Sequence, residues 1–284
     1  MASDPRFSCR SEPMRKTYYA PADISVSLDM VNLVEALNCP HCGAPLDLGP
    51  GEIIVTCRYC GSDIRIAGEK KFLLKHSMVA TTYQEDEIRR VISSWMAGGA
   101  FRPDDLARAS RIDGLECVYL PFYVFEVDAF TTWRGVLSRT GQPYEKSGDL
   151  RKDYFWKILG RRSSPFPTRE YRLPLTAKTT FDMSQMVRNS KFLNAEIDED
   201  EAKRLVEEEV TDHQKRLLLQ EEVDDIIEAK TEVDVKDTEF VHAPIWFVRY
   251  SYKKKLYEMT VDGASADVIK ADVPPPSTGF GGLF

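Results

Sequence analysis

The chain has 284 residues, a formal net charge of −7 and the apolar content of a globular protein. This length accommodates a small module and one or two further domains. The longest strand-like apolar run covers residues 117–125, far short of the roughly 20 residues that span a bilayer, so we predict no transmembrane segment.

Residues 1–37 predict an extended arm that ends in a short helix at 26–37. The arm has no hydrophobic periodicity, and its first eleven residues lack the apolar core of a signal peptide, which favours a cytoplasmic location. Its basic side chains are Arg6, Arg10, Arg15 and Lys16. We interpret them as a solvated tail, with contact to nucleic-acid phosphates as the alternative.

Two cysteine pairs follow, and they are the strongest chemical signal in the chain. Cys39 and Cys42 form the first pair, Cys57 and Cys60 the second, and a glycine follows each pair. Four thiolates at this spacing can converge on one tetrahedral zinc ion, and glycine suits the sharp turn of each pair because it adopts positive φ. We therefore predict a Cys₄ zinc ribbon at residues 38–68, with a strand, a turn and a second strand between the pairs.

Other chemistries suit these cysteines less well. Two disulfides would need an oxidising compartment, and iron in the same sulfur geometry is the alternative metal. His41 lies inside the first pair, where we expect it to face solvent rather than to bind the ion. With four thiolates bound the zinc is structural, because no open position remains for catalysis. Cys9 and Cys117 stand alone, and Cys117 is expected to be a buried thiol.

Residues 69–190 predict a first α+β unit. Its helix at 84–96 carries Ile88, Val91, Ile92 and Trp95 on one face, at helical spacing. The other expected elements are a strand at 71–82, a helical turn after Pro103, a long β segment at 115–138 and strands near 154–159 and 170–180.

Residues 191–272 predict a second α+β unit, and residues 273–284 a proline-spaced tail. A long helix is expected at 198–230, inside a segment (196–239) with 18 acidic and 6 basic residues. Such a segment disfavours contact with nucleic-acid phosphates. His213 falls on the apolar stripe of this helix, which suggests a core or boundary position. A three-stranded meander is expected at 243–252, 256–261 and 266–270, with Asp262-Gly263 as its second turn.

The two units resemble each other. Residues 118–125 and 241–248 both follow a helical region, and both place a proline just before aromatic and β-branched residues. We therefore predict an α+β fold in which two duplicated helix-plus-antiparallel-meander units follow the zinc ribbon. The expected core residues are Tyr119, Phe122, Phe125, Trp246 and Phe247.

These features together resemble a prokaryotic family of uncharacterised zinc-ribbon proteins, often labelled TFIIB-type zinc ribbon-containing or primosomal protein N′-like. The resemblance covers residues 39–270, and the final meander is also similar to a PepSY-type unit. The inherited names are not functions for this chain. It has no phosphate-binding G-x-x-x-x-G-K-[ST] loop for a helicase, and aromatic strands rather than helical repeats follow its ribbon.

The sequence predicts a binding protein rather than an enzyme, because it contains no H-E-x-x-H, G-x-S-x-G or G-x-G-x-x-G motif. We expect a cytoplasmic zinc-binding adapter or assembly protein that docks onto a larger protein complex. An RNA-, ribosome- or RNA-polymerase-associated factor, using the ribbon and the basic arm, is the alternative. In the tail, Phe280, Leu283 and Phe284 are the candidate partner-binding residues, and the partner is another protein or a second copy of the chain.

Overall fold

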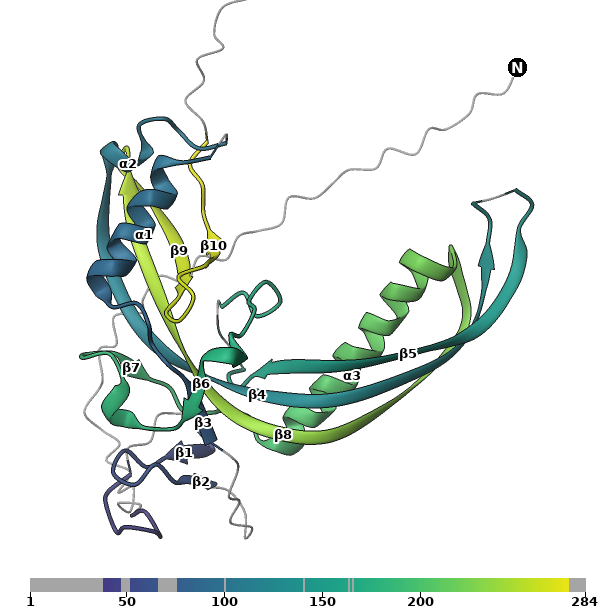
Figure 1. The fold of residues 1–284 in the computed structure, drawn as a ribbon, viewed down its shortest axis with the longest axis horizontal. Coiled ribbons are helices and arrows are strands. Elements are labelled where there is room, and N and C mark those ends of the chain that lie inside the picture. The colour runs from purple at the N-terminus through teal and green to yellow at the C-terminus, as the bar shows by residue number, and fades with distance from the viewer. Residues whose placement is uncertain are drawn as a thin grey trace, which may run out of the picture. The chain divides into compact units, whose positions relative to one another are not determined.

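A computed structural model describes residues 38–46, 52–65, 76–99, 101–139, 141–162, 164 and 166–275 (Figure 1). The chain divides into two compact units, Met1–Glu35 and Ala36–Phe284, and every described residue belongs to the second. The predicted arm, its helix at 26–37 and the three tail residues Phe280, Leu283 and Phe284 lie outside the described residues.

Two long antiparallel strands form the middle of an eight-stranded mixed sheet (Figure 1). β4 (Ser110–Leu137) and β8 (Asp225–Tyr252) pair along nearly their whole length, and each has a continuous buried stretch at its centre. Aromatic and β-branched residues dominate these stretches, as expected for a strand that is covered on both faces.

The other strands extend this sheet or lie beside it. They are β3 (His76–Val79), β5 (Tyr144–Leu159), β6 (Lys178–Thr180), β7 (Lys191–Phe192), β9 (Lys255–Asp262) and β10 (Val268–Ala271). β5 pairs antiparallel with β4, while β9 and β10 continue the sheet beyond β8. β3 runs parallel to β8, and β7 runs parallel to β4. A separate antiparallel pair joins β1 (Ile54–Thr56) to β2 (Asp63–Arg65).

Two helices cover different parts of the sheet. α1 (Glu85–Ala97) begins with a capping box between Gln84 and Glu87, and α3 (Glu199–Leu217) begins where the Asp198 carboxylate accepts a hydrogen bond from the Glu201 amide. The strands β4, β5 and β8 curve around α3 (Figure 1). The shorter helical segments are α2 (Leu106–Ala109), η1 (Leu175–Ala177), η2 (Met183–Gln185) and the π-helical η3 (Leu218–Glu222).

Each of the two longer helices has its own hydrophobic core. One core packs α1 against β8, β9 and the first part of β4, and it includes Tyr119 and Trp246. A second packs α3 against β4 and β5 and includes Phe125, while a third contains Phe122. These four predicted core residues are no more than 2% exposed, whereas Phe247 is only partly buried beside the third core.

The predicted helix at 198–230 is too long by several residues. The π-helical turn ends at Glu222, and β8 begins at Asp225. The sequence after Asp225 alternates between partly buried and exposed side chains, and long-range pairing with β4 is stronger than the local helical tendency. One result is the contact between the Thr131 and Thr231 hydroxyls, whose oxygens lie 2.9 Å apart.

One other strand prediction needs correction. The strand expected at 170–180 is present only as β6, because turns and the η1 helix occupy the preceding residues. In the ribbon, β1 pairs with β2 across the second cysteine pair. The strand and turn expected before β1 fall largely on residues 47–51, which lie outside the described residues. The α+β class is confirmed, and no helix among the described residues is long and apolar enough to cross a membrane.

Candidate metal centre

The first cysteine pair forms a tight turn, and both of its sulfurs point toward the second pair. The Cys39 amide donates a hydrogen bond to the Ala44 carbonyl (2.7 Å), and the Gly43 amide donates one to the Cys39 carbonyl (2.8 Å). Gly43 has φ of 73°, a conformation that a residue with a Cβ rarely adopts. The glycine after the pair is therefore required by the geometry of the turn.

The second pair repeats this arrangement. The Cys57 amide donates to the Ser62 carbonyl (2.8 Å), the Gly61 amide donates to the Cys57 carbonyl (2.9 Å), and φ of Gly61 is again 73°. Two equivalent turns thus present two sulfurs each.

The four sulfurs converge on one point. Cys39 Sγ lies 3.6 Å from Cys60 Sγ, Cys42 Sγ lies 3.6 Å from Cys57 Sγ, and all four ligand atoms lie within 4.8 Å of one another. A disulfide bond is about 2.05 Å long, so these are four free thiols. A tetrahedral ion with Zn–S bonds of about 2.3 Å separates its sulfurs by about 3.8 Å. The geometry therefore fits one tetrahedral metal ion.

The sulfurs influence one another's protonation. The hydroxyl and amide of Ser62 lie against Cys60 and lower the pKa of its thiol to about 6. At Cys42 the Ala44 amide acts to lower the pKa, but desolvation and the neighbouring sulfurs outweigh it and raise the pKa to about 12. One thiolate thus makes the next proton harder to remove, and a bound cation would relieve this repulsion.

Burial divides the ligands into two classes. Cys39 and Cys57 are 2% and 0% exposed, whereas Cys42 and Cys60 are exposed to solvent. His41 is also exposed, as predicted, and the cluster found among the described residues contains cysteines alone. Cys117 lies outside this cluster in β4, where burial raises the pKa of its thiol to about 12 and keeps it protonated.

The cysteine module (residues 38–65) packs against the body of the protein, which is the described chain from residue 76 onward. Ile54 is buried in the α3 core, and the Ile53 amide donates a hydrogen bond to the Ala195 carbonyl (3.0 Å). The Asn194 side chain also accepts a bond from the Thr56 amide (3.2 Å). The module and the α3 core therefore share apolar and backbone contacts.

Two hollows share Arg58 and Tyr59 of the second cysteine turn as lining residues. One, of about 270 Å³, is lined by Pro45, Leu46, Thr56, Arg58, Tyr59 and Asn194. The other, of about 340 Å³, is lined by Arg58, Tyr59, Cys60, Gly61, Phe181, Asp182, Met183 and Ser184. Tyr59 belongs to both and is 73% exposed. The cysteine spacing predicted the ligands but gave no indication of these hollows, which depend on segments distant in sequence.

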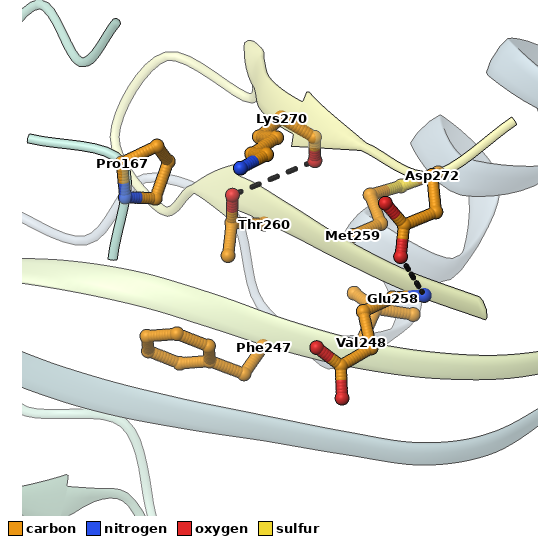
Figure 2. Close-up of a pocket in the computed structure, with 8 residues that line it drawn as sticks. All are labelled: Pro167, Phe247, Val248, Glu258, Met259, Thr260, Lys270 and Asp272. Carbon is orange, nitrogen blue, oxygen red and sulfur yellow. Dashed lines mark hydrogen bonds between the residues drawn. The ribbon is translucent and has the colours of Figure 1, made fainter. Parts of the chain in front are cut away.

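A further hollow of about 320 Å³ lies over β8, β9 and β10 (Figure 2). Its lining is Pro167, Phe247, Val248, Glu258, Met259, Thr260, Lys270 and Asp272. Two of its polar contacts join neighbouring strands: Thr260 Oγ1 donates to the Lys270 carbonyl (3.5 Å), and the Glu258 amide donates to the Asp272 carboxylate (3.4 Å). Both contacts hold β9 against β10 and the residue that follows it.

Comparison with family models, with curated proteins and with solved structures finds no match for this chain. The interpretation of the site therefore depends on its own residues and geometry.

Proposed function

We propose that this protein is a non-enzymatic, zinc-binding adapter that docks onto a larger protein complex. The observation that carries this proposal is the convergence of four thiols, within 4.8 Å of one another, from two equivalent turns. Four thiolates complete the tetrahedral coordination of zinc and leave no position for a substrate. The ion would then stabilise the module and not take part in a reaction.

Zinc is the metal we propose, and a reducing cytoplasm is the location. Thiolate ligands suit zinc, and iron in the same geometry is the alternative that elemental analysis distinguishes. Sulfurs 3.6 Å apart form disulfides under oxidising conditions, so a reducing compartment is needed to keep them as ligands. The resemblance to uncharacterised prokaryotic zinc-ribbon proteins is part of this proposal.

The docking surface we propose is the knuckle surface: Pro45, Leu46, Arg58, Tyr59 and Phe181. Its support is the 73% exposure of Tyr59, which lines both hollows. An exposed aromatic ring beside a concave surface is typical of a partner contact, because the ring contributes a large apolar area at low entropic cost. The partner would insert an apolar side chain beside Tyr59.

Affinity capture from the native host tests this surface. The full chain and its Tyr59→Ser variant are compared with Phe155→Ser, which removes an aromatic side chain of similar exposure (72%) on β5. We expect Tyr59→Ser to lose the captured proteins and Phe155→Ser to retain them, with zinc content unchanged in both. Equal capture by Tyr59→Ser and the unmodified chain would refute the surface.

The same captures include a nuclease-treated sample and a salt series. Binding through phosphates weakens steeply with salt, whereas an apolar contact does not. Capture that survives nuclease and moderate salt supports the adapter. If capture is lost under both conditions, the adapter proposal is wrong and the RNA-, ribosome- or polymerase-associated factor is favoured instead.

We also propose that the body is a duplicated unit, with β3–α1–β4–β5 as the first copy and β7–α3–β8–β9 as the second. The buried positions of the two helices support this. Ile88, Ile92 and Met96 of α1 precede Ala202, Val206 and Val210 of α3 by one constant number of residues, and all six face a core.

The register of the two long strands supports the same proposal. Leu120 pairs with Ala243, its equivalent in the aligned stretches, as expected for two copies related by a twofold axis. The pairing skips Asp113 in β4 and Lys236 in β8, which occupy equivalent positions, and a third irregularity lies near the end of the pairing, between Arg134 and Gly135. Irregularities at matching places are hard to explain by a chance similarity of aromatic strands.

Backbone contacts at the strand ends also correspond. The Gly160 amide donates to the Pro121 carbonyl and the Gly263 amide to the Pro244 carbonyl, both at 2.8 Å. Each glycine carbonyl then accepts from the segment leading into the other copy's helix. These contacts are Glu196 N to Gly160 O (2.7 Å) and Thr82 N to Gly263 O (3.1 Å). In each proposed copy, the glycine after the last strand would therefore hold the segment that precedes the helix of the other copy.

A further inference from the structure

A chain of buried polar groups connects the cysteine module to the main sheet. Thr56 Oγ1 donates to Asp63 Oδ1 (2.6 Å), and Asp63 Oδ2 lies 3.2 Å from His76 Nδ1. His76 Nε2 lies 2.8 Å from His242 Nδ1, and His242 Nε2 lies 3.0 Å from the Leu193 carbonyl oxygen. The chain runs from β1 and β2 through β3 to β8, so it crosses from the module to the body.

These groups are shielded from water. The side chains of His76 and Asp63 are 6% and 4% exposed, and His242 is fully buried. The His76 ring stacks on Phe181 with centroids 3.9 Å apart, and the His242 ring stacks on Phe192 at 4.1 Å. Solvent therefore cannot substitute for a missing partner, and each contact in the chain must be satisfied internally.

Hydrogen-bond direction fixes the number of protons. The Leu193 carbonyl only accepts, so His242 Nε2 carries a hydrogen. If His242 is neutral, its Nδ1 accepts and His76 Nε2 must donate. His76 Nδ1 then faces the Asp63 carboxylate, whose other oxygen already accepts from Thr56. Without one more proton, two acceptors would oppose each other in a buried site.

The electrostatics of His242 agree with this assignment. Its burial, together with the neighbouring His76, holds the pKa of His242 well below its ordinary value. His242 is therefore the neutral ring, and the additional proton belongs to the contact between His76 and Asp63.

Other charged groups on the surrounding segments are engaged elsewhere. Asp182 accepts hydrogen bonds from Ser184 and Gln185, and Lys178 on β6 pairs with Glu239 on β8. Lys191 on β7 pairs with Glu116 at 2.7 Å. None of these ion pairs or caps involves the Asp63–His76 contact.

We propose that one proton, held between Asp63 and His76, fastens the cysteine module to the body, and that the attachment weakens as rising pH removes this proton. The direction of this pH dependence follows from the contact. With the proton present, His76 and Asp63 attract each other; without it, the lone pair of His76 Nδ1 faces the Asp63 carboxylate. The contact involves Thr56, Asp63 and His76 and none of the four cysteines.

Nitrogen-15 NMR of the histidine rings in the full chain tests the proton count directly. At pH 7, where a solvated imidazole is mostly neutral, we expect His242 to carry hydrogen on Nε2 alone. His76 should show either two protonated nitrogens or the signature of a proton shared with Asp63. A neutral His76 with hydrogen on Nε2 alone and an ionised Asp63 would overturn the proposal.

Amide hydrogen exchange tests the consequence. After correction for intrinsic exchange rates, protection of the β1 and β2 amides should fall roughly tenfold or more between pH 6.5 and 9, because the buried pair loses its hydrogen bond and water cannot replace it. Unchanged protection would contradict the proposal.

Asp63→Asn provides the discriminating variant. The introduced side-chain amide can donate to a neutral His76 while its oxygen accepts from Thr56, so the contact needs no additional proton. We expect protection in Asp63→Asn to be independent of pH and to exceed that of the unmodified chain at pH 9. The control, Asp234→Asn, changes an exposed carboxylate on β8 and should behave as the unmodified chain does. A pH-dependent loss in Asp63→Asn equal to that of the unmodified chain would refute the proposal, and if this variant does not fold, the ring spectra decide.

Discussion

At the scale of single residues, the four cysteines do not have equal surroundings. Cys39 and Cys57 are buried and begin the two turns, whereas Cys42 and Cys60 are exposed. Loss of a buried cysteine would therefore remove a packed side chain together with one of the four candidate metal ligands. Its effect should extend beyond the module, because Ile54 packs in the same core as α3.

We expect Cys39→Ser to contain less than about half an equivalent of metal, where the unmodified protein contains one. Three thiolates bind zinc more weakly than four, and structural zinc contributes roughly 10–16 kcal/mol of apparent folding free energy in small peptides. Elemental analysis with thiol titration provides the measurement. Cys117→Ala is the control and should retain the metal. A metal-free unmodified protein with four free thiols would disprove the site.

Trp246 should be the most costly single aromatic residue to remove from the α1 core. It is 2% exposed, and Trp246→Ala should lower the free energy of unfolding by roughly 3–5 kcal/mol. Phe155→Ala is the control, because Phe155 is 72% exposed and its loss should change stability by no more than about 0.5 kcal/mol. Denaturant unfolding compares the two, and similar midpoints would contradict the assigned core.

At the scale of elements, the glycines that follow β5 and β9 make matching contacts, Gly160 with Pro121 and Gly263 with Pro244. A Cβ on Gly160 would lie 3.2 Å from Pro121 atoms, and one on Gly263 would lie 3.0 Å from Pro244 atoms. The close approach follows from the short amide-to-carbonyl bond that each glycine makes. Neither position can accept a side chain without displacement of a proline.

Gly160→Ala and Gly263→Ala should therefore destabilise the protein by similar amounts, roughly 1–3 kcal/mol each. Gly98→Ala is the control, since the nearest atom to its added Cβ would be 3.9 Å away. Thermal or denaturant unfolding measures all three variants. A large penalty at only one of the two glycines would count against the duplicated unit.

At the scale of the whole molecule, the tail beyond Pro275 lies outside the described residues, and we propose it as a second partner-binding segment beside the knuckle surface. Three prolines at 274–276 favour an extended chain, which reduces the entropy lost when a tail binds. The large apolar residues Phe280, Leu283 and Phe284 would then supply the contact area.

Deletion of residues 279–284 should leave metal content and unfolding free energy unchanged while it reduces partner recovery or lowers the oligomeric state. Affinity capture and light scattering provide the two measurements. The matched control replaces only Gly281 and Gly282 with serine, which preserves the apolar side chains. Full recovery of the same partners after deletion, with the same oligomeric state, would show that the tail does not bind.

The sequence by itself determined the features that depend on short spacings. Two residues between cysteines and a glycine after each pair define the turns, so all four candidate metal ligands could be predicted. Hydrophobic periodicity likewise predicted α1, and Asp262-Gly263 correctly placed the turn after β9. Local geometry fixes such features because only neighbouring residues take part in them.

Only the tertiary structure decided the long-range contacts. The end of α3 and the full length of β8 follow from pairing with β4, which local pattern does not encode. His76 and His242 lie 166 positions apart, and their rings meet because β3 runs parallel to β8. Scattered histidines in a sequence carry no sign of this contact. Their protonation is set by burial and by the direction of each hydrogen bond, and both depend on how distant segments pack.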